Sequence, residues 1–435
     1  MKGELIMALP KITFAGGGER GQYLTHKSND TTIRFVLNYP GIVDADVLRA
    51  ATKALVESVD VLHSTFFVDP NVAYWKVNEE MDENNYFHYI RTEGDPALTA
   101  YSLSLLPVYH EDKVQLRVEL VQSETASSVL VSISHLCVDG GDGKYLLGKL
   151  MEAYNMILET GSADALEVKN GSRAPEKVYK TVSIKEAKKL FAMPGGGLKA
   201  TSAYPFPTED AGMCREVHTV IPREIMSAAR KKAKLIDASA NDLLLAACYQ
   251  VYAAFPEVDA TQPCSISSMM DLRRHCVDGE SEGLCNMSGA LPTAMLDGVP
   301  ENFADTLSQI AQQTNAVKDD PLAGLTGLPI LHGIARGIPV WMQMMFAEKA
   351  YGAMPVGLTN LGNLKCQDHA LGDLVPTGGI FGGPLKKKNG MQVSIISFDG
   401  ECVLACYGRY TAEDAAHIQN TLDSMAKVIE DYAAE

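Results

Sequence analysis

Apolar and polar positions alternate along this chain with two different periods. Residues 128–134 form a short apolar run typical of a buried strand, whereas 114–121 alternates strictly between apolar and polar residues, which predicts a strand with one side in water. The stretches 47–59 and 144–158 repeat their apolar positions at helical spacing. Strands and helices interleaved in this way predict an α/β protein.

The second half of the chain continues this alternation. Pro222 favours the start of a helix, because its fixed φ suits the first turn, and Ser239 is a candidate cap for an apolar helix over 241–255. A closing amphipathic helix is expected over 412–432. Strands are expected at 215–221, 264–270, 356–359, 391–397 and 402–407.

The best boundary between two subdomains lies in the region 161–176. This region is rich in small and charged residues and contains Pro175. A chain of 435 residues is also long for one hydrophobic core. We therefore expect an N-terminal subdomain over 1–175 and a C-terminal subdomain over 176–435.

Composition and charge argue against several classes of protein. A net charge of −16 and a pI near 5.1 disfavour nucleic-acid binding, which needs a basic face. The nine cysteines are scattered without a paired Cys-x-x-Cys spacing, which favours reduced thiols over a disulfide framework. No run approaches the roughly 18 apolar residues of a membrane span, and no signal peptide is evident. We expect a cytoplasmic protein with small-molecule partners and no bound metal.

The candidate chemistry lies where the apolar run 128–134 ends. His135 and Asp139 follow this strand, and Gly140 and Gly141 permit a tight bend before the next helix. A histidine just beyond a strand can take a proton near neutral pH, because its unperturbed pKa is about 6.5. An isolated histidine is more often a hydrogen-bonded core residue, so the rest of the sequence has to decide between these two roles.

The pattern His135-x-x-x-Asp139-Gly140 resembles the motif of the condensation-domain and chloramphenicol-acetyltransferase-like superfamily, which includes alcohol acetyltransferases. The resemblance extends in the same order over nearly the whole chain. It implies two chloramphenicol-acetyltransferase-like subdomains, each a mixed sheet with helices, and an active-site channel at their interface. The other similar stretches are a strand at 33–37 and a helix-like run over 43–67, a long helix at 238–247, a strand ending in an arginine at 265–273, and an Asn-x-Gly element at 356–362.

The sequence departs from the family at one visible position. Ser134 stands where condensation domains of peptide synthetases carry the first of two successive histidines. The second histidine is the one usually assigned to catalysis, so His135 is retained, and a free-standing acyltransferase is favoured over a peptide-synthetase domain. The Asp-Phe-Gly-Trp-Gly motif of the plant branch is missing, which argues against that subfamily.

The resemblance implies acyl transfer without a covalent enzyme intermediate. His135 would accept the proton of an alcohol or amine as this group attacks a thioester, and would then protonate the departing thiolate. Asp139 is implied to turn away from the cleft and to pair with Arg273, with Arg274 as an alternative. This pair would brace the loop that aims the histidine.

The oxyanion that forms on the former carbonyl oxygen needs a hydrogen-bond donor. Candidates are the side chains of Thr359 and Asn360 and the backbone amides of Gly140 and Gly141. Thr359 and Asn360 are equally well explained as the end of a strand and its turn. The sequence does not choose among these candidates.

An acyl-coenzyme A thioester is the expected donor, because no carrier domain or carrier-type Gly-x-Asp-Ser site is fused to the chain. The expected acceptor is a small-molecule alcohol or amine, and no cofactor is expected to be bound. Two alternatives stay open. One is a free-standing condensation enzyme that takes its acyl group from a separate carrier protein. The other is a non-catalytic relative that acts as a binding protein.

A glycine-rich stretch near the N-terminus matches the letters of the dinucleotide-binding fingerprint. Gly16, Gly18 and Gly21 follow a short apolar stretch, but residues 22–32 are polar and predict turns. Without a helix N-terminus, a pyrophosphate has no binding site there. We expect a glycine loop and no nucleotide.

Overall fold

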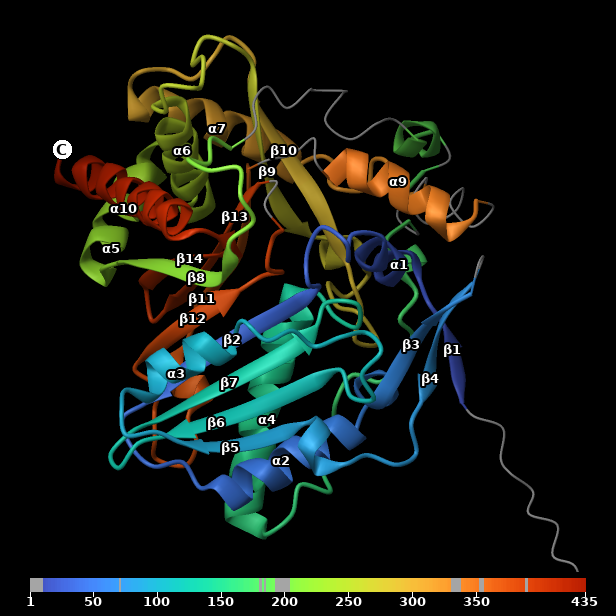
Figure 1. Cartoon of the computed structure of the whole chain (residues 1–435). Coiled ribbons are helices and arrows are strands. Elements are labelled where there is room, and N and C mark those ends of the chain that lie inside the picture. Colours follow the sequence, from blue (N-terminus) through green and yellow to red (C-terminus); the bar gives the residue numbers. More distant parts are fainter. Residues whose placement is uncertain are drawn as a thin grey trace, which may run out of the picture.

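The computed structural model describes residues 11–69, 72–179, 182–183, 185–191, 204–329, 338–351, 356–387 and 390–435. Two lobes, each built on one mixed sheet, lie one above the other in Figure 1. The α/β fold predicted from the sequence is confirmed. A small antiparallel sheet beside the lower lobe consists of β1 (Ile12–Phe14), β4 (Ala73–Val77) and β3 (Ser64–Val68).

The first lobe is built on a five-stranded sheet. Its elements are β2 (Thr32–Tyr39), β5 (Phe87–Arg91), β6 (Leu116–Gln122), β7 (Ser127–Ser134), β12 (Gly378–Gly382), α2 (Ala45–Glu57), α3 (Pro96–Leu103) and α4 (Gly140–Thr160). The strand order is β12-β2-β7-β6-β5, so β7 lies at the centre. Helices α2 and α4 pack against each other, whereas α3 packs on β2, β6 and β7 and reaches the second lobe.

The second lobe is built on a six-stranded sheet. Its elements are β8 (Met213–Ile221), β9 (Cys264–Asp271), β10 (Ser288–Met295), β11 (Val356–Leu364), β13 (Met391–Phe398), β14 (Glu401–Tyr410), α5 (Arg223–Ala233), α6 (Ala240–Ala253), α7 (Phe303–Lys318) and α10 (Ala412–Ala434). The strand order is β10-β9-β11-β13-β14-β8. The helices α5, α6, α7 and α10 share one core with this sheet. Helix α9 (Val340–Tyr351) packs separately, against α1 (Gly17–Leu24).

Side-chain caps explain where several helices begin. Ser239 accepts a hydrogen bond from Asp242 N at 3.2 Å, and the Asp242 carboxylate accepts one from Ser239 N at 2.7 Å, which closes the first turn of α6. Asp139 caps α4 by accepting from Asp142 N at 3.0 Å. The cap predicted at Ser239 is confirmed, and α4 begins directly after Asp139.

Strand β12 comes from the second half of the chain but belongs to the sheet of the first lobe. It pairs antiparallel with β2, with Gly379 opposite Leu37. A Cβ atom at Gly379 would lie 1.8 Å from Val36 O, so only glycine allows this close approach. Strand β12 also contacts β13 and β14, and it therefore joins the sheets of the two lobes.

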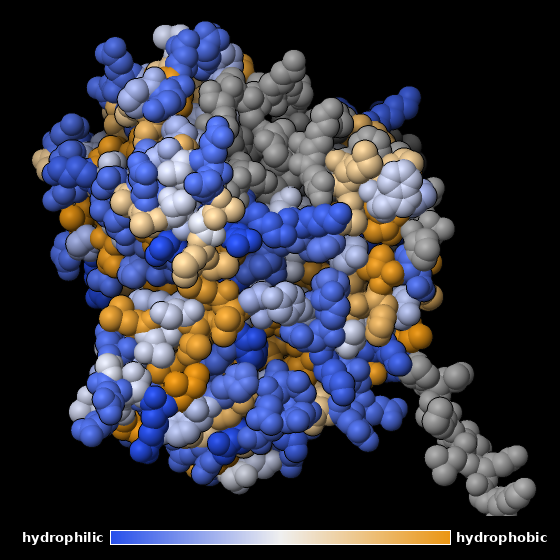
Figure 2. Space-filling model, in the orientation of Figure 1, coloured by the Kyte–Doolittle hydropathy of each residue, from blue (hydrophilic) through white to orange (hydrophobic). Residues whose placement is uncertain are grey.

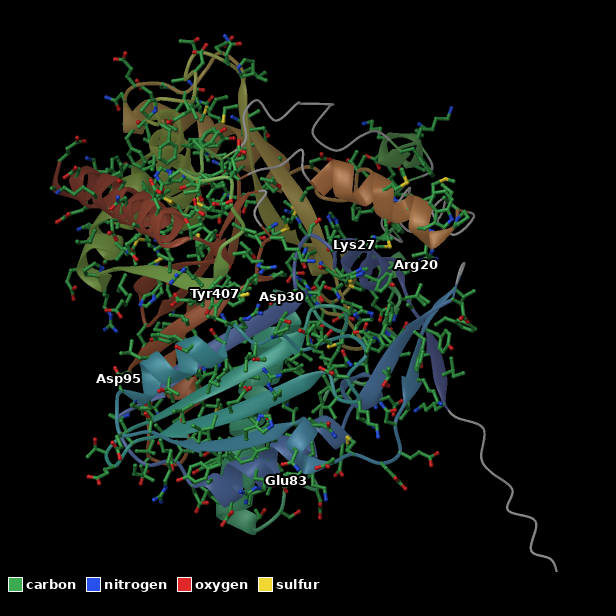
Figure 3. The ribbon with its side chains drawn as sticks, viewed as in Figure 1. Arg20, Lys27, Asp30, Glu83, Asp95 and Tyr407 are labelled. Carbon is green, nitrogen blue, oxygen red and sulfur yellow. The ribbon has the colours of Figure 1, made fainter. Side chains whose placement is uncertain are left out.

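Arg34 on β2 is fully buried where the two lobes meet. Its guanidinium pairs with Asp30 and lies 5.4 Å from the ring centroid of Tyr407, and Figure 3 marks Asp30 and Tyr407 at this junction. Arg34 Nη1 also donates to Gly383 O at 3.2 Å. The Tyr407 hydroxyl lies 3.2 Å from Ser104 Oγ of the first lobe. These contacts fasten one lobe to the other.

Strand β6 differs from its prediction. One wet side was predicted over 114–121, but β6 is buried almost throughout, and Glu119 is only 2 % exposed. Arg117 pairs with Glu119 and donates from Nη1 to Pro107 O at 3.2 Å. The polar side chains of this strand therefore contact protein rather than water, although one carboxylate oxygen of Glu119 is buried without a hydrogen-bond partner.

The run 43–67, expected to be helix-like, contains two further elements. Helix α2 ends at Glu57, the 3-10 helix η1 spans Asp60–His63, and β3 follows. The last residues of the run are aromatic or β-branched, and their burial alternates from one residue to the next. Both features favour a strand over a helix.

Two observations on the described residues concern membrane crossing and the cysteines. Within the described ranges, no helix combines the length and the apolar character that a membrane crossing requires. None of the nine cysteines, all of which lie in the described ranges, forms a disulfide, and Cys214 is exposed whereas the others are buried or half-buried.

Candidate active site

The motif segment follows the central strand of the sheet in the first lobe. Strand β7 pairs with β2 on one side and with β6 on the other, and it ends at Ser134. The backbone N–H of His135 then donates to Thr31 O at 2.7 Å, beside the first residue of β2. The loop 136–139 leads from there into α4. The imidazole is thus carried by a backbone that the sheet holds in place.

The imidazole of His135 is held in one tautomer. Its Nδ1 lies 2.8 Å from Val138 O and 3.1 Å from Oδ1 of Asn286. Both oxygens are acceptors, so Nδ1 carries the proton and Nε2 keeps its lone pair. Burial lowers the pKa of His135 below its ordinary value, which keeps the ring neutral at pH 7. A neutral ring with a free lone pair is the form that a general base requires.

Asn286 fixes this arrangement from the second lobe. Its Nδ2 donates to His135 O at 2.8 Å and to Leu136 O at 3.1 Å, so its Oδ1 must face the imidazole. The side chain is 8 % exposed and spans the loop that begins with the histidine. Sequence reasoning missed Asn286, because the residue lies 151 positions from His135 and belongs to no motif that the sequence analysis recognised.

Asp139 turns away from the imidazole and joins a buried ion cluster. Its Oδ2 lies 2.9 Å from Nη1 of Arg273 and accepts from Met287 N at 2.7 Å. Arg273 comes from the 3-10 helix η7 (Leu272–His275), which follows β9 in the second lobe. The pairing that the resemblance implied for Asp139 and Arg273 is present in the structure.

The cluster contains a second carboxylate that the sequence did not suggest. Asp142 Oδ2 lies 2.8 Å from Arg273 Nη2 and accepts from Cys285 N at 2.8 Å. Burial and the nearby Asp139 carboxylate raise the pKa of Asp142 to about 6. Arg274, the alternative partner, is exposed and donates to the carbonyl of Lys318, because successive residues of η7 point in different directions.

Gly140 and Gly141 form the first turn of α4. The Asp139 carbonyl accepts from Gly143 N at 2.8 Å, and the Gly140 and Gly141 amides have no acceptor among the described residues. A Cβ atom at Gly140 would lie 2.6 Å from Leu361 Cδ2, so β11 approaches the helix closely there. The start of α4 therefore presents two free N–H groups directly after the motif loop.

Thr359 and Asn360 lie on β11. Asn360 Oδ1 accepts from Gly362 N at 2.8 Å, and its Nδ2 lies 3.4 Å from Asn241 Oδ1. The Asn360 side chain thus stabilises the turn at Gly362, which has a φ of 70°. Among the hydrogen bonds of the described residues, none joins Thr359 or Asn360 to His135.

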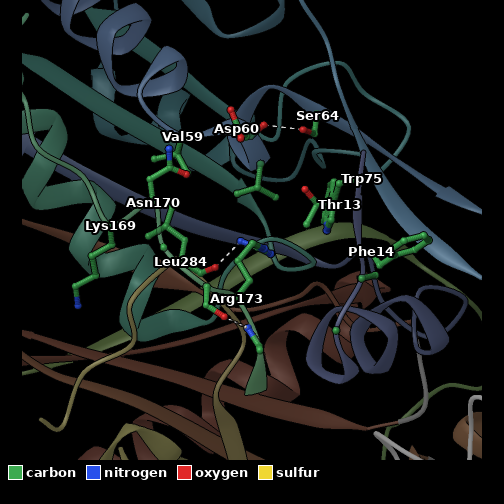
Figure 4. A pocket seen from close by; sticks show the side chains of 16 residues that line it. Thr13, Phe14, Val59, Asp60, Ser64, Trp75, Lys169, Asn170, Arg173 and Leu284 are labelled. Atoms are coloured by element: carbon green, nitrogen blue, oxygen red, sulfur yellow. Dashed lines mark hydrogen bonds between the residues drawn. The ribbon is translucent and has the colours of Figure 1, made fainter. Parts of the chain in front are cut away.

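A buried ion pair supports the motif loop from the side. Arg173 pairs with Glu19 of α1 and donates from Nη2 to Cys137 O, within the loop, at 3.0 Å. Trp75 Nε1 donates to the same Glu19 carboxylate at 3.1 Å. Arg173 and Trp75 line a cavity of about 440 Å³ next to the small sheet (Figure 4). Sequence reasoning missed this pair, whose members lie far apart in the chain.

The prediction of a glycine loop without a helix near the N-terminus is wrong. Helix α1 begins at Gly17, because the Glu19 carboxylate accepts from Gly16 N and closes the first turn. A Cβ atom at Gly18 would lie 2.6 Å from Asn286 O, so glycine is required for packing against the active-site segment. Glu19 places negative charge at the helix N-terminus, where a pyrophosphate would have to bind.

A second cavity lies between the lobes beside the motif. It measures about 460 Å³, and its lining includes Thr31, whose carbonyl holds the His135 backbone. Leu105 and Tyr109 line it from the first lobe, and Arg409 lines it from the second. Figure 2 shows apolar side chains along the junction of the lobes on this face. Among the described residues, no group of three or more potential metal ligands is placed to hold an ion.

The chain shares its fold with solved condensation domains and with a trichothecene acetyltransferase, which is the fold that the sequence resemblance implied. Solved structures of this class match nearly the whole chain, although at low sequence identity. A scan against protein-family models finds no match, and neither does a search of curated proteins.

Three solved structures illustrate this similarity. Polyketide synthase associated protein 5 from Mycobacterium tuberculosis has a TM-score of 0.71 at 15% identity, over 97% of this chain and 98% of that one. A trichothecene 15-O-acetyltransferase from Fusarium sporotrichioides has a TM-score of 0.69 at 12% identity, over 97% and 95%. The starter condensation domain of rhizomide synthetase, in complex with C8-CoA, has a TM-score of 0.68 at 12% identity, over 97% and 95%. At these identities the similarity establishes the fold.

Proposed function

We propose that this protein is an acyltransferase that moves an acyl group from acyl-coenzyme A to the hydroxyl or amine of a small-molecule acceptor. The observation that carries the proposal is the environment of His135. Two acceptor oxygens, from Val138 and Asn286, take the proton on Nδ1, and Nε2 is left as the basic atom. This chemistry agrees with the acyltransferases and condensation domains among the similar structures.

In the proposed reaction, His135 is the only residue that accepts and returns a proton. The acceptor O–H or N–H gives its proton to Nε2 of His135 while the oxygen or nitrogen attacks the thioester carbonyl carbon. The tetrahedral intermediate collapses, the C–S bond breaks, and the imidazolium returns the proton to the departing thiolate. The products are an ester or amide and free coenzyme A, and the histidine is neutral again.

The oxyanion of this intermediate has two candidate donors in the amides of Gly140 and Gly141. They lie at the N-terminus of a 21-residue helix, where the helix dipole favours negative charge. The side chains of Thr359 and Asn360 stay as further candidates for hydrogen bonding to the oxyanion or to either substrate. Asp139 and Arg273 act in this scheme as positioning residues, because they hold the loop and the start of α4 without facing the imidazole.

Two observations bear on the donor. One similar condensation domain is a complex with C8-CoA, which supports a coenzyme A ester. A condensation domain of a polyketide synthase and a polyketide synthase associated protein also share the fold, which favours a carrier-bound acyl group as the second candidate. A reducing compartment such as the cytoplasm suits nine cysteines without a disulfide in either case.

The test is release of free thiol from a panel of acyl-coenzyme A esters, with pooled alcohols and amines as acceptors. We expect release that requires an acceptor and falls at least about a hundredfold in His135→Ala. His88→Ala is the matched control, because His88 lies on β5 and its imidazole, among the described residues, is hydrogen-bonded to Asn84 O of the same lobe. Release that survives in His135→Ala would remove the proposed base.

If no coenzyme A ester releases thiol, the proposed acyl donor would have to change, whereas the fold assignment would stand. The same variants would then be assayed with acyl groups loaded on a separate holo-carrier protein. Transfer that depends on His135 would identify the carrier-bound donor. Absence of transfer from both kinds of donor would leave a binding protein without this chemistry.

A further inference from the structure

Helix α5 carries a row of cations on the outer side of the second lobe. Its buried side packs into the core of the lobe, and the helix lies against α10 at the left edge of the view in Figure 1. The opposite side, with the residue that follows the helix, carries four exposed cations, here called the α5 basic face: Arg223, Arg230, Lys231 and Lys234.

The four cations share one face of the helix. Counted with Ser227, their positions are three or four residues apart except for the adjacent Arg230 and Lys231, and together they cover one broad helical face. From Arg223 to Lys234 the row extends roughly 16 Å at about 1.5 Å per residue. Arg230 and Lys231 lie four and three residues before Lys234, so an anionic partner would meet a locally concentrated positive charge there.

The α5 basic face is unpaired within the part of the chain that the structure describes. None of its four side chains makes an ion pair or hydrogen bond with another residue in the described part of the chain. Lys232 on the same helix is different, because it donates to Tyr432 O at 2.9 Å and lies 3.4 Å from Glu435. The face stands out in a chain whose net charge is −16.

The surface beside these cations is hollowed and is lined by charged and small residues, including the aliphatic stems of the arginines and lysines. A hollow of about 500 Å³ lies between α5 and the turn at Asp399 and Gly400, and its lining contains no apolar side chain. Asp399 is the one acid in that lining, and its Oδ1 accepts from Cys366 N at 3.2 Å. A ligand here would meet positive charge and hydrogen-bond donors rather than an apolar anchor.

We propose that the α5 basic face docks an acidic segment of a partner protein, whose carboxylates face the four cations along the helix. An elongated row of carboxylates can meet all four, whereas a single phosphate cannot span them. Nucleic acid is disfavoured because its long phosphate chain would extend beyond the four cations over a molecule with a net charge of −16, whereas a short acidic segment would not. The inference is independent of acyl transfer, since it uses neither the motif nor the cavity between the lobes.

The test uses a fluorescent helical peptide of about four turns with glutamates at the spacing of the four cations. Its affinity is measured at about 0.05 M salt, where surface charges are weakly screened. We expect R223Q/R230Q/K231Q/K234Q to weaken binding by about tenfold or more, because each exposed pair contributes roughly a factor of two. Zero-length carboxyl-to-amine crosslinking should join the peptide to Lys231 and Lys234.

The control changes the net charge equally at other exposed lysines, K76Q/K113Q/K188Q/K189Q. All eight substituted side chains are exposed, so the thermal midpoints of both variants should match the wild type. Equal weakening in the two variants would reduce the effect to overall charge and overturn the proposal. Binding that is as tight for a glutamine version of the peptide, or inorganic pyrophosphate binding in preference to the peptide, would overturn it as well.

Discussion

At the scale of single residues, the site is defined by what surrounds one imidazole. Val138 O and Asn286 Oδ1 orient the proton on Nδ1, and burial keeps His135 neutral. Charge on the ring would require protonation of Nε2 in a poorly solvated position. The same surroundings that make the ring a base therefore also set the pH at which it stops being one.

The acid limb of the pH profile tests this environment. Burial lowers the pKa of His135, and only the neutral form accepts a proton, so kcat/KM should fall at low pH with a midpoint below about 6.5. The measurement is thiol release between about pH 5 and pH 8. A midpoint above 6.5 would mean that the ring is stabilised as imidazolium, contrary to its burial.

Asn286 should control that midpoint. In Asn286→Asp a carboxylate replaces the amide oxygen 3.1 Å from Nδ1, and the midpoint should rise by about one unit or more, because an opposite charge favours imidazolium. Asn286→Ala should lower kcat by about tenfold to a hundredfold through loss of orientation. An unchanged pH profile in Asn286→Asp would show that the contact does not act on the ring.

Part of this residue-level site could be predicted from the sequence. His135 and Asp139 stand four positions apart in one segment, and a family resemblance pointed from Asp139 to Arg273. Asn286 and Arg173 could not be found in this way. Each reaches the motif loop through backbone carbonyls, and a contact with a carbonyl leaves no pattern in the side chains of the segment that it touches.

At the scale of elements, side-chain caps indicated where two helices begin, whereas pairing between distant segments hid several strands. The cap at Ser239 and the helix after Asp139 follow from side chains within one turn. Strands β10 and β12 were missed, because β10 contains Pro292 and β12 is mostly glycine. Their pairing partners lie far away in the sequence, and pairing rather than propensity makes them strands.

Two glycine substitutions should separate these element-scale effects. Gly379→Ala should destabilise the protein by at least about 2 kcal/mol and lower activity, because its Cβ would overlap Val36 O and disrupt the pairing of β12 with β2. Gly148→Ala, in the interior of α4 with open space around it, should raise the free energy of unfolding by about 0.5–1 kcal/mol. Urea unfolding measures both, and equal effects would contradict the steric argument.

At the scale of the whole molecule, buried charge joins the two lobes. Arg273 of the second lobe meets two carboxylates of α4 and its cap, and Arg34 of the first lobe reaches Gly383 and Tyr407. Neither connection is visible in periodicity or composition. Two subdomains could be predicted from the sequence. The contacts that hold them together could not, because they join positions far apart in the chain.

Removal of the Arg273 side chain should therefore affect the entire fold. Arg273→Ala leaves Asp139 and Asp142 buried without their cation, and the expected loss is about 3–5 kcal/mol together with loss of turnover. Arg274→Ala is the matched control and should change stability by less than about 0.5 kcal/mol, because Arg274 is exposed. Thermal and urea unfolding decide the outcome, and a stable Arg273→Ala protein would remove the cluster from its structural role.

Strand β12 lies in the second half of the chain but completes the sheet of the first lobe, and this limits how the gene of such a protein can be divided or recombined. A gene fragment that ended near residue 175 would encode the first lobe without its edge strand, and the hydrogen-bonding groups of β2 would be open to other chains. An exchange of lobes between related genes would meet the same obstacle unless 378–382 travelled with the first lobe. We therefore expect the two lobes to be inherited together, although each has a sheet of its own, because β13 and β14 of the second lobe also contribute to the core of the first.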